Sequence, residues 1–177
     1  TRERHGLGDT YYRYPIGDRT WSFTGRPGSD AGPITIKTQD SQEMNVVGLM
    51  SGTSADGVDA ALVTIVPQKT GPRVEMIAFH SLSYPRSLQQ RILSASVSGT
   101  VTDICHLNAL LGEWFADAAL GVIRSAQLSP EDVDLIGSHG QTVHHLPHGI
   151  KDTGVGAIRS TLQIAEPAVI AERTGIT

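Results

Sequence analysis

The chain has 177 residues, of which 39% are hydrophobic and 18% are charged. This length and apolar content suffice for one ordinary globular domain with a hydrophobic core, which excludes a disordered or fibrous chain. The formal net charge of −4 at pH 7 gives no basic footprint for nucleic acid or for an anionic membrane surface. We therefore expect neither nucleic acid nor a membrane as a partner.

The sequence shows neither a membrane span nor a secretion signal. No apolar run approaches the roughly 18 residues of a transmembrane helix, and no charged segment followed by an apolar one opens the chain. The single cysteine, Cys105, lies in an apolar periodic segment, which predicts a buried, unreactive thiol. We expect a cytoplasmic protein. Because the chain runs from Thr1 to Thr177 and stops inside a continuing pattern, we also expect a fragment.

Residues 1–44 form the first distinct segment. They contain five arginines and six glycines and follow no sustained period of 2 or 3.6. We predict an extension with little core of its own, and a mobile tail is the favoured interpretation. The alternative is a short hairpin or a partner-binding surface built from its aromatic residues, which are Tyr11, Tyr12, Tyr14, Trp21 and Phe23.

From residue 45 the chain changes to short apolar runs separated by turns. Residues 46–50 predict a buried strand, residues 51–57 a turn, and residues 58–66 a second strand that completes a hairpin. Residues 73–82 alternate Val74, Met76 and Ala78 with the residues between them, which predicts a third antiparallel strand. The three strands make a meander.

Two helices should follow the meander. Pro85 suits the first turn of a short helix that ends near Gly99, with an apolar face of Leu88, Ile92 and Leu93. Thr102 would cap a longer helix at residues 103–126. Its apolar residues recur at steps of three and four, which predicts a stripe packed on a sheet: Ile104, Leu107, Leu111, Trp114, Phe115, Ala118 and Val122.

The last third of the chain returns to strands. Residues 133–137 fit a short buried parallel strand reached through the helical crossover. Residues 138–142 would then lie at its carboxyl end, where open α/β sheets bind ligands. After an irregular excursion at residues 148–158, we predict a strand at 161–164 and a helix at 166–173. The pattern as a whole is typical of an α/β fold.

The turn between the first two strands has the chemistry of a phosphate site. Residues 48–63 read Gly-Leu-Met-Ser-Gly-Thr-Ser-Ala-Asp-Gly-Val-Asp-Ala-Ala-Leu-Val. Small side chains let a ligand reach the backbone, the hydroxyls of Thr53 and Ser54 can donate to phosphate oxygens, and Asp56 suits a hydrated Mg²⁺. An ordinary hairpin rich in glycine and serine remains the alternative.

Two further segments of the sequence carry recognisable motifs. Residues 136–147 read Ile-Gly-Ser-His-Gly-Gln-Thr-Val-His-His-Leu-Pro, and residues 160–177 begin Ser-Thr-Leu-Gln-Ile-Ala-Glu-Pro. In this order the three resemble the anhydro-N-acetylmuramic acid kinases, which carry Gly-Leu-Met-Ser-Gly-Thr-Ser-x-Asp-Gly, Ser-His-Gly-Gln-Thr-x-x-His and Leu-Gln-Ile-Gly-x-Pro. The resemblance covers residues 45–177. It departs at Ala165, where the family usually has glycine, and an added methyl there could perturb a close backbone approach.

The resemblance implies a fold and a reaction. The fold is a ribonuclease H-like, actin-type ATPase lobe, a mixed sheet with flanking helices, and residues 45–177 would be an incomplete N-terminal lobe. The enzyme would open the 1,6-anhydro ring of anhydro-N-acetylmuramic acid with water and phosphorylate O6, using ATP and Mg²⁺. Its partner would be this small-molecule anhydrosugar. The oligomeric state stays open, with a homodimer of the full-length protein as one alternative.

The resemblance also assigns site residues. The ATP and phosphate site would comprise Gly52, Thr53, Ser54, Ala55, Asp56, Gly57, Val58 and Asp59. Asp56 would hold Mg²⁺ through a water molecule, whereas Asp59, inside the second strand, could instead be a structural hydrogen-bond acceptor. The sugar side would comprise Ser138, His139, Gly140, Gln141, Thr142 and Gln163.

Several polar residues near these motifs have alternative roles. Glu166 could reach the ligand, but we expect it to cap the last helix. Arg159 and Arg173 could contact the lactyl carboxylate of the substrate or simply be exposed. The histidines at 139, 144, 145 and 148 could bind zinc, yet their spacing suits no helical face and no cysteine joins them, so we favour sugar contact.

The general base of the family has no counterpart in this chain. In the family the catalytic aspartate follows the segment that matches the end of this chain, and no aspartate here corresponds to it. We therefore expect no catalytic residue within these 177 residues and no turnover by the chain alone. Two alternatives remain: a levoglucosan kinase, since those enzymes are similar to this family, and a non-catalytic remnant that still binds a sugar or a nucleotide.

Overall fold

The computed structural model describes residues 2–4, 10–16, 19–22 and 42–177, which divide into the units Thr1–Ser41 and Gln42–Thr177. In the first unit, β1 (Arg2–Arg4), β2 (Thr10–Ile16) and β3 (Arg19–Ser22) form an antiparallel sheet in that order. The pairing of β2 with β3 is the hairpin that the alternative for this segment predicted. Phe23 lies outside the described residues, and a partner-binding role stays a prediction.

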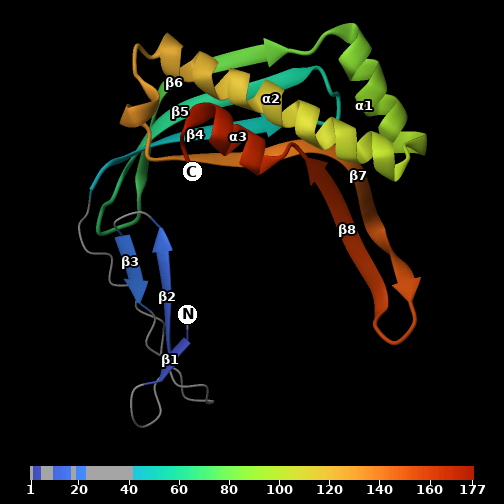
Figure 1. Cartoon of the computed structure of the whole chain (residues 1–177), viewed down its shortest axis with the longest axis horizontal. Helices are drawn as coiled ribbons and strands as arrows, with labels where there is room; N and C mark the ends of the chain where they lie inside the picture. Colours follow the sequence, from blue (N-terminus) through green and yellow to red (C-terminus); the bar gives the residue numbers. More distant parts are fainter. Residues whose placement is uncertain (1, 5–9, 17–18, 23–41) are drawn as a thin grey trace. The chain divides into compact units, whose positions relative to one another are not determined.

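The second unit is built on a five-stranded sheet in the order β6-β5-β4-β7-β8 (Figure 1). Its strands are β4 (Met44–Ser51), β5 (Gly57–Val66), β6 (Arg73–Ser83), β7 (Leu135–Asp152) and β8 (Gly156–Ile164). The first three form the predicted antiparallel meander, and β7 pairs with β4 in parallel, as predicted for the strand after the crossover. The mixed α/β architecture is therefore confirmed.

The prediction for residues 133–158 is wrong in one respect, because β7 does not stop at residue 137. It runs through the motif at 138–142 and on to Asp152, and it pairs with β8 in a long antiparallel hairpin (Figure 1). The polar residues and Gly149 indicated a loop, but Gly149 occupies an irregularity between Leu146 and Ile150 at φ 71. A glycine at such a bulge lets pairing resume beyond it, so the strand continues.

A bulge also changes the predicted alternation of β6. The pairing of β5 with β6 shifts between Leu62 and Val63, so that Phe79 pairs with Ala61 and Met76 with Val63. Met76 and Phe79 therefore lie on the same face, whereas strict alternation along residues 73–82 predicts opposite faces for them. Met76 is 69% exposed, Phe79 is 57% exposed, and Met50 of β4 is 55% exposed. This face of the sheet is apolar and open.

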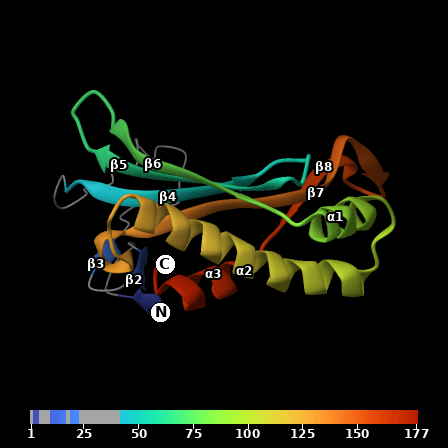
Figure 2. The same cartoon turned by 90° about the horizontal axis from the view of Figure 1, so that it is seen from above.

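The helices cover the other face of the sheet. They are α1 (Arg86–Ser98), α2 (Val101–Ser125), a 3₁₀ turn η1 (Pro130–Asp132) and α3 (Pro167–Thr174). Figure 2 shows α2 and α3 on one side of the strands. The predicted stripe of α2 is confirmed, because its apolar residues join one buried cluster with the inward residues of β4 and β5, namely Val47, Leu49, Val58, Ala60 and Leu62. No helix among the described residues is long and apolar enough to cross a membrane.

Three details of the helices differ from the prediction. Cys105 is exposed, because it lies on the solvent side of α2 rather than in the stripe. Leu93 of α1 is 43% exposed, while Leu88 and Ile92 are buried. The cap of α2 is Thr100 and not Thr102, so the helix begins earlier than expected.

The start of α2 is a complete capping box. The backbone N–H of Asp103 donates to Thr100 Oγ1 over 3.2 Å, and the Asp103 carboxylate accepts from the N–H and hydroxyl of Thr100 over 2.9 and 2.6 Å. Two otherwise unpaired donors at the helix start are thereby satisfied. The hydroxyl and the N–H of Thr100 hold the pKa of Asp103 below its usual value.

The junction between β8 and α3 is held by Asn108 of α2. Its side chain accepts from the N–H of Ala165 over 3.0 Å and donates to Glu166 over 2.8 Å. Ala165 has φ 152, a region that favours glycine. A residue with a Cβ is strained at this position, which gives a physical reason for the glycine of the usual family pattern and no reason for the alanine here.

We expect Thr100→Ala to lower the free energy of unfolding of the chain by about 1 kcal/mol, because the first turn of α2 loses its cap. The matched control is Thr102→Ala, which removes an exposed hydroxyl two residues further on and should change stability by less than about 0.5 kcal/mol. Urea unfolding followed by circular dichroism measures both. Equal losses in the two variants would contradict the assignment of the cap.

We expect Ala165→Gly to raise the free energy of unfolding by about 1 kcal/mol, because glycine adopts this backbone conformation without strain. Ala168→Gly in α3 is the control, and it should lower stability, since glycine in a helix is unfavourable. The same unfolding measurement distinguishes them. A loss of stability in both variants would show that Ala165 is not strained.

Candidate functional site

The turn that joins β4 to β5 presents its polar groups to solvent. The N–H of Ala55 donates to the carbonyl of Gly52 over 3.2 Å, and Ala55 has φ 50 with its methyl group fully buried. Thr53, Ser54 and Asp56 are exposed on the outside of this turn. The buried methyl anchors the turn to the core, so hydroxyls and a carboxylate remain free to meet a ligand.

Contacts within and behind the turn fix its shape. Ser54 Oγ donates to the Asp56 carboxylate over 3.0 Å, and Gln89 of α1 donates from Nε2 to the carbonyl of Ser54 over 3.1 Å. The backbone N–H groups of Thr53 and Ser54 donate no hydrogen bond to another described residue. The turn therefore has exposed donors of the kind that bind phosphate oxygens.

A buried amide joins this turn to the second motif. Gln141 of β7 is fully buried; its Oε1 accepts from Ser51 Oγ over 2.7 Å, and its Nε2 donates to the carbonyl of Gly52 over 2.7 Å. Ser51 Oγ also lies 2.5 Å from the carbonyl oxygen of Gly57. The β4–β7 pairing shifts its register so that Ser51 faces Gln141. Two motifs that are 90 residues apart thus form one hydrogen-bonded unit.

The predicted sugar-side residues divide into two groups. Thr142 and Gln163 face each other across β7 and β8, and Gln163 Nε2 donates to Thr161 Oγ1 over 2.6 Å and to Thr142 Oγ1 over 3.4 Å. Gly140 has φ 76, and a Cβ there would lie 3.0 Å from the carbonyl oxygen of Ile164. The strands can approach closely at this position only because it is glycine.

Ser138 and His139 lie apart from that pair. Both are exposed on β7, and His139 Nδ1 lies 3.2 Å from the carbonyl oxygen of Gly140. The structure therefore brings Gln141 to the β4–β5 turn and pairs Thr142 with Gln163, but it does not join Ser138 or His139 to either through a hydrogen bond among the described residues.

The remaining predicted phosphate residues have different surroundings. Val58 is fully buried in the core, so only its backbone could meet a ligand. A Cβ at Gly57 would lie 2.5 Å from the carbonyl oxygen of Leu82, which shows that glycine is required there for packing against β6. Asp59 is exposed, and no side chain or backbone N–H of the described residues donates to its carboxylate, so the alternative of a structural acceptor gains no support.

The structure also decides between the alternative roles of the histidines, Glu166 and Arg173. Within the described residues no three metal-ligating side chains come together, so the histidines do not form a zinc site there. Glu166 caps α3, as expected, by accepting from the N–H of Ala168 over 3.2 Å. Arg173 pairs with Glu113 and Asp117 of α2, which makes it a link between α3 and α2 and not a free group for a substrate carboxylate.

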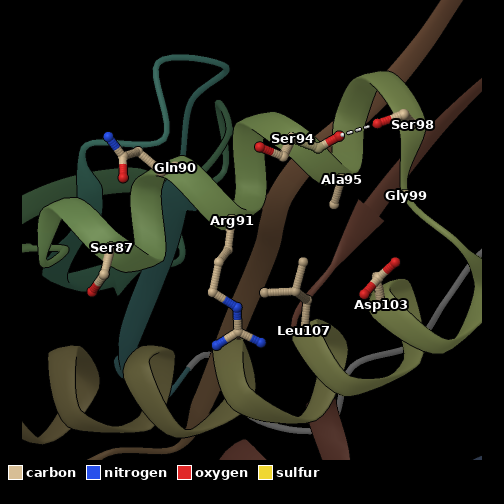
Figure 3. Close-up of a pocket in the computed structure, with 9 residues that line it drawn as sticks. All are labelled: Ser87, Gln90, Arg91, Ser94, Ala95, Ser98, Gly99, Asp103 and Leu107. Atoms are coloured by element: carbon tan, nitrogen blue, oxygen red, sulfur yellow. Dashed lines mark hydrogen bonds between the residues drawn. The ribbon is translucent and has the colours of Figure 1, made fainter.

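Two grooves adjoin these elements. One of about 410 Å³ lies between α1 and the start of α2, and Figure 3 shows Arg91 extending from α1 towards Leu107 across it, but it contains none of the predicted site residues. The second, also about 410 Å³, lies between the end of α1 and the β7–β8 hairpin. Its lining includes Val143, His144 and Leu162, which are neighbours in sequence of Thr142 and Gln163.

Sequence reasoning missed two residues that the structure places behind the turn. Gln89 lies on α1, and Tyr84 lies in the link between β6 and α1, where its N–H donates to the carbonyl of Asp56 over 2.9 Å. Neither belongs to one of the three motifs. No periodic or motif signal could have found them, because their roles depend on how β6 and α1 pass behind the turn.

Comparison with known proteins agrees with the arrangement of the motifs. The family model "Anhydro-N-acetylmuramic acid kinase" matches residues 44–177. A protein of that name from Caldanaerobacter subterraneus subsp. tengcongensis is 53% identical over 143 residues, which are 80% of this chain and 36% of the relative. One from Bacillus cereus is 47% identical over 137 residues, 76% of this chain and 34% of the relative.

The chain therefore spans about a third of the length of these curated relatives. Its five-stranded mixed sheet with flanking helices is consistent with the N-terminal portion of an actin-type ATPase lobe. Since the family model covers most of the chain and its three motifs lie in the predicted order, the chain belongs to the anhydro-N-acetylmuramic acid kinase family.

Proposed function

We propose that the protein carrying this chain is a kinase that acts on anhydro-N-acetylmuramic acid. Water opens the 1,6-anhydro ring, O6 receives the γ-phosphoryl group of ATP, and the products are N-acetylmuramic acid 6-phosphate and ADP. The names of the relatives support the substrate, and family membership supports the reaction class. Because the donor is ATP, we propose the cytoplasm as its location.

One observation carries this proposal. Gln141 of the second motif binds Ser51 and Gly52 of the β4–β5 turn, so one residue proposed for the sugar side contacts the turn proposed for phosphate. Phosphoryl transfer depends mainly on positioning and on electrostatic stabilisation. A rigid link between the group that holds the phosphate and the strand that leads to the sugar side serves that requirement.

The residues present fit a phosphate and a hydrated Mg²⁺. The N–H groups of Thr53 and Ser54 and the hydroxyl of Thr53 would bind phosphate oxygens, and the exposed carboxylate of Asp56, which accepts from Ser54 Oγ, would hold the metal through water. A single carboxylate suits Mg²⁺, which keeps several of its waters. When bound, Mg²⁺ would screen the negative charge on the transferring group.

We propose that Thr142 and Gln163 bind the sugar. The hydroxyl of Thr142 and the amide of Gln163 lie 3.4 Å apart across the paired strands β7 and β8, so both could bind the same ligand. We assign no general base in this chain, because no aspartate here matches the catalytic aspartate implied by the family resemblance. The 177 residues alone would therefore bind ligands without turnover.

We expect the protein expressed from the complete gene to convert anhydro-N-acetylmuramic acid and ATP to N-acetylmuramic acid 6-phosphate. Mass spectrometry identifies the product, and release of ADP gives the rate. Levoglucosan serves as the competing substrate, and the 177-residue chain is assayed in parallel and should form no product. Preference for levoglucosan would make the protein a levoglucosan kinase, and inactivity on both sugars would favour the non-catalytic remnant.

We expect Gln141→Ala to change mainly the free energy of unfolding and Gln163→Ala to change mainly the KM for the anhydrosugar. Gln141→Ala should lower the free energy of unfolding by about 1–3 kcal/mol, because Ser51 and Gly52 lose a buried partner. Gln163→Ala alters a half-buried side chain and should cost less than about 0.5 kcal/mol, while raising the KM for the anhydrosugar. Urea unfolding and steady-state kinetics separate the two effects. Unchanged KM for the sugar in Gln163→Ala would remove Gln163 from the sugar site.

A further inference from the structure

Tyr84 lies directly behind the phosphate turn. It follows β6 and precedes α1, it is only 7% exposed, and its N–H is bound to the carbonyl of Asp56 over 2.9 Å. Its ring forms a T-shaped pair with Trp114 of α2, with centroids 5.6 Å apart and planes at 89°. The ring is thus fixed between α2 and the turn, with little freedom to reorient.

The hydroxyl of Tyr84 is buried, and it makes no hydrogen bond of ordinary geometry with the residues that the structure describes. A buried hydroxyl without a partner costs free energy, so such a group needs an explanation. Burial raises the pKa of Tyr84 to about 12; the adjacent Ser51 hydroxyl lowers it, and the charge of Asp56 raises it. At neutral pH the group keeps its proton and is available as a donor.

Ser51 is the hydroxyl next to this donor, since it is the side chain whose interaction lowers the pKa of Tyr84. Its Oγ lies 2.5 Å from the carbonyl oxygen of Gly57 and 2.7 Å from Oε1 of Gln141, and both of these groups are acceptors. A hydroxyl has one proton to donate and two lone pairs to accept with. The proton of Ser51 serves only one of its two neighbours at a time, and its lone pairs accept no hydrogen bond from another described residue.

We propose that Tyr84 is a positioning residue of the phosphate turn, whose hydroxyl donates to Ser51 Oγ and so holds Ser51 between Gly57 and Gln141. This inference rests on the proposed phosphate-binding role of the turn. A donor to Ser51 polarises its hydroxyl and strengthens the bond that Ser51 donates. Tyr84 touches no reacting atom; it acts through Ser51 on the orientation of residues 52–56.

The test is Tyr84→Phe in the protein expressed from the complete gene. This change removes one oxygen and keeps the ring against Trp114. We expect the KM for ATP to rise about tenfold, the effect of one lost hydrogen bond, with kcat and the KM for the anhydrosugar nearly unchanged. Thr64→Val is the matched control, since it removes a half-buried hydroxyl at the opposite end of the β4–β5 hairpin, where Thr64 donates to Asn45 over 2.9 Å.

Ser51→Ala and the double variant test the proposed connection. If Tyr84 acts through Ser51, adding Tyr84→Phe to Ser51→Ala raises the KM for ATP no further. A purely structural tyrosine would instead give the opposite pattern. Removing its unpaired hydroxyl would raise the unfolding midpoint, leave the KM for ATP unchanged and add independently to Ser51→Ala, and this result would overturn the inference.

The unfolding midpoints of the four proteins without ligand form a second cycle that does not depend on kinase activity. Coupling between Tyr84 and Ser51 in this cycle supports the hydrogen bond, and additivity within error contradicts it. If the unsubstituted protein phosphorylates no sugar, the proposed function fails, while this cycle still decides whether Tyr84 positions Ser51.

Discussion

The buried amide of Gln141 is the interaction on which the site depends. Its two polar ends are satisfied by Ser51 and by the carbonyl of Gly52, both at 2.7 Å. A buried amide without partners would be costly, so the network exists only when β4 and β7 are paired in the observed register. Formation of the sheet and formation of the site are therefore coupled, because this register brings the motif on β7 into hydrogen-bond contact with the turn.

Helix α2 holds the strands and the last helix of this site in place. Its apolar stripe covers β4 and β5 on one face of the sheet, and its polar residues support the segments on either side. Asn108 holds the junction of β8 and α3, and Glu113 with Asp117 binds Arg173. One helix thus fixes both the strands that carry the motifs and the helix that follows the third motif, which explains why these motifs can be far apart in sequence.

The other face of the sheet is open in the described part of the chain. Met50, Met76 and Phe79 are more than half exposed there, an arrangement that isolated domains usually avoid. The relatives are about three times as long as the matched segment. The phosphate turn and the β7–β8 hairpin are thus well defined locally, while their use in turnover is a property that we propose for the whole protein.

The sequence by itself determined the meander, the long helix, the parallel strand and the three motifs, because short-range periodicity and local turn chemistry encode them. Tertiary structure decided the rest. Thr100 became the cap instead of Thr102, the glycine bulge at Gly149 extended β7 through a segment that looked like a loop, and Gln141 turned inward to Ser51. The Thr100–Asp103 capping box is a local pattern that favoured Thr100, whereas the strand extension and the inward turn of Gln141 depend on pairing between residues distant in the chain, which no local pattern records. Tyr84 entered the site for the same reason, since only packing between β6, α1 and α2 places it behind the turn.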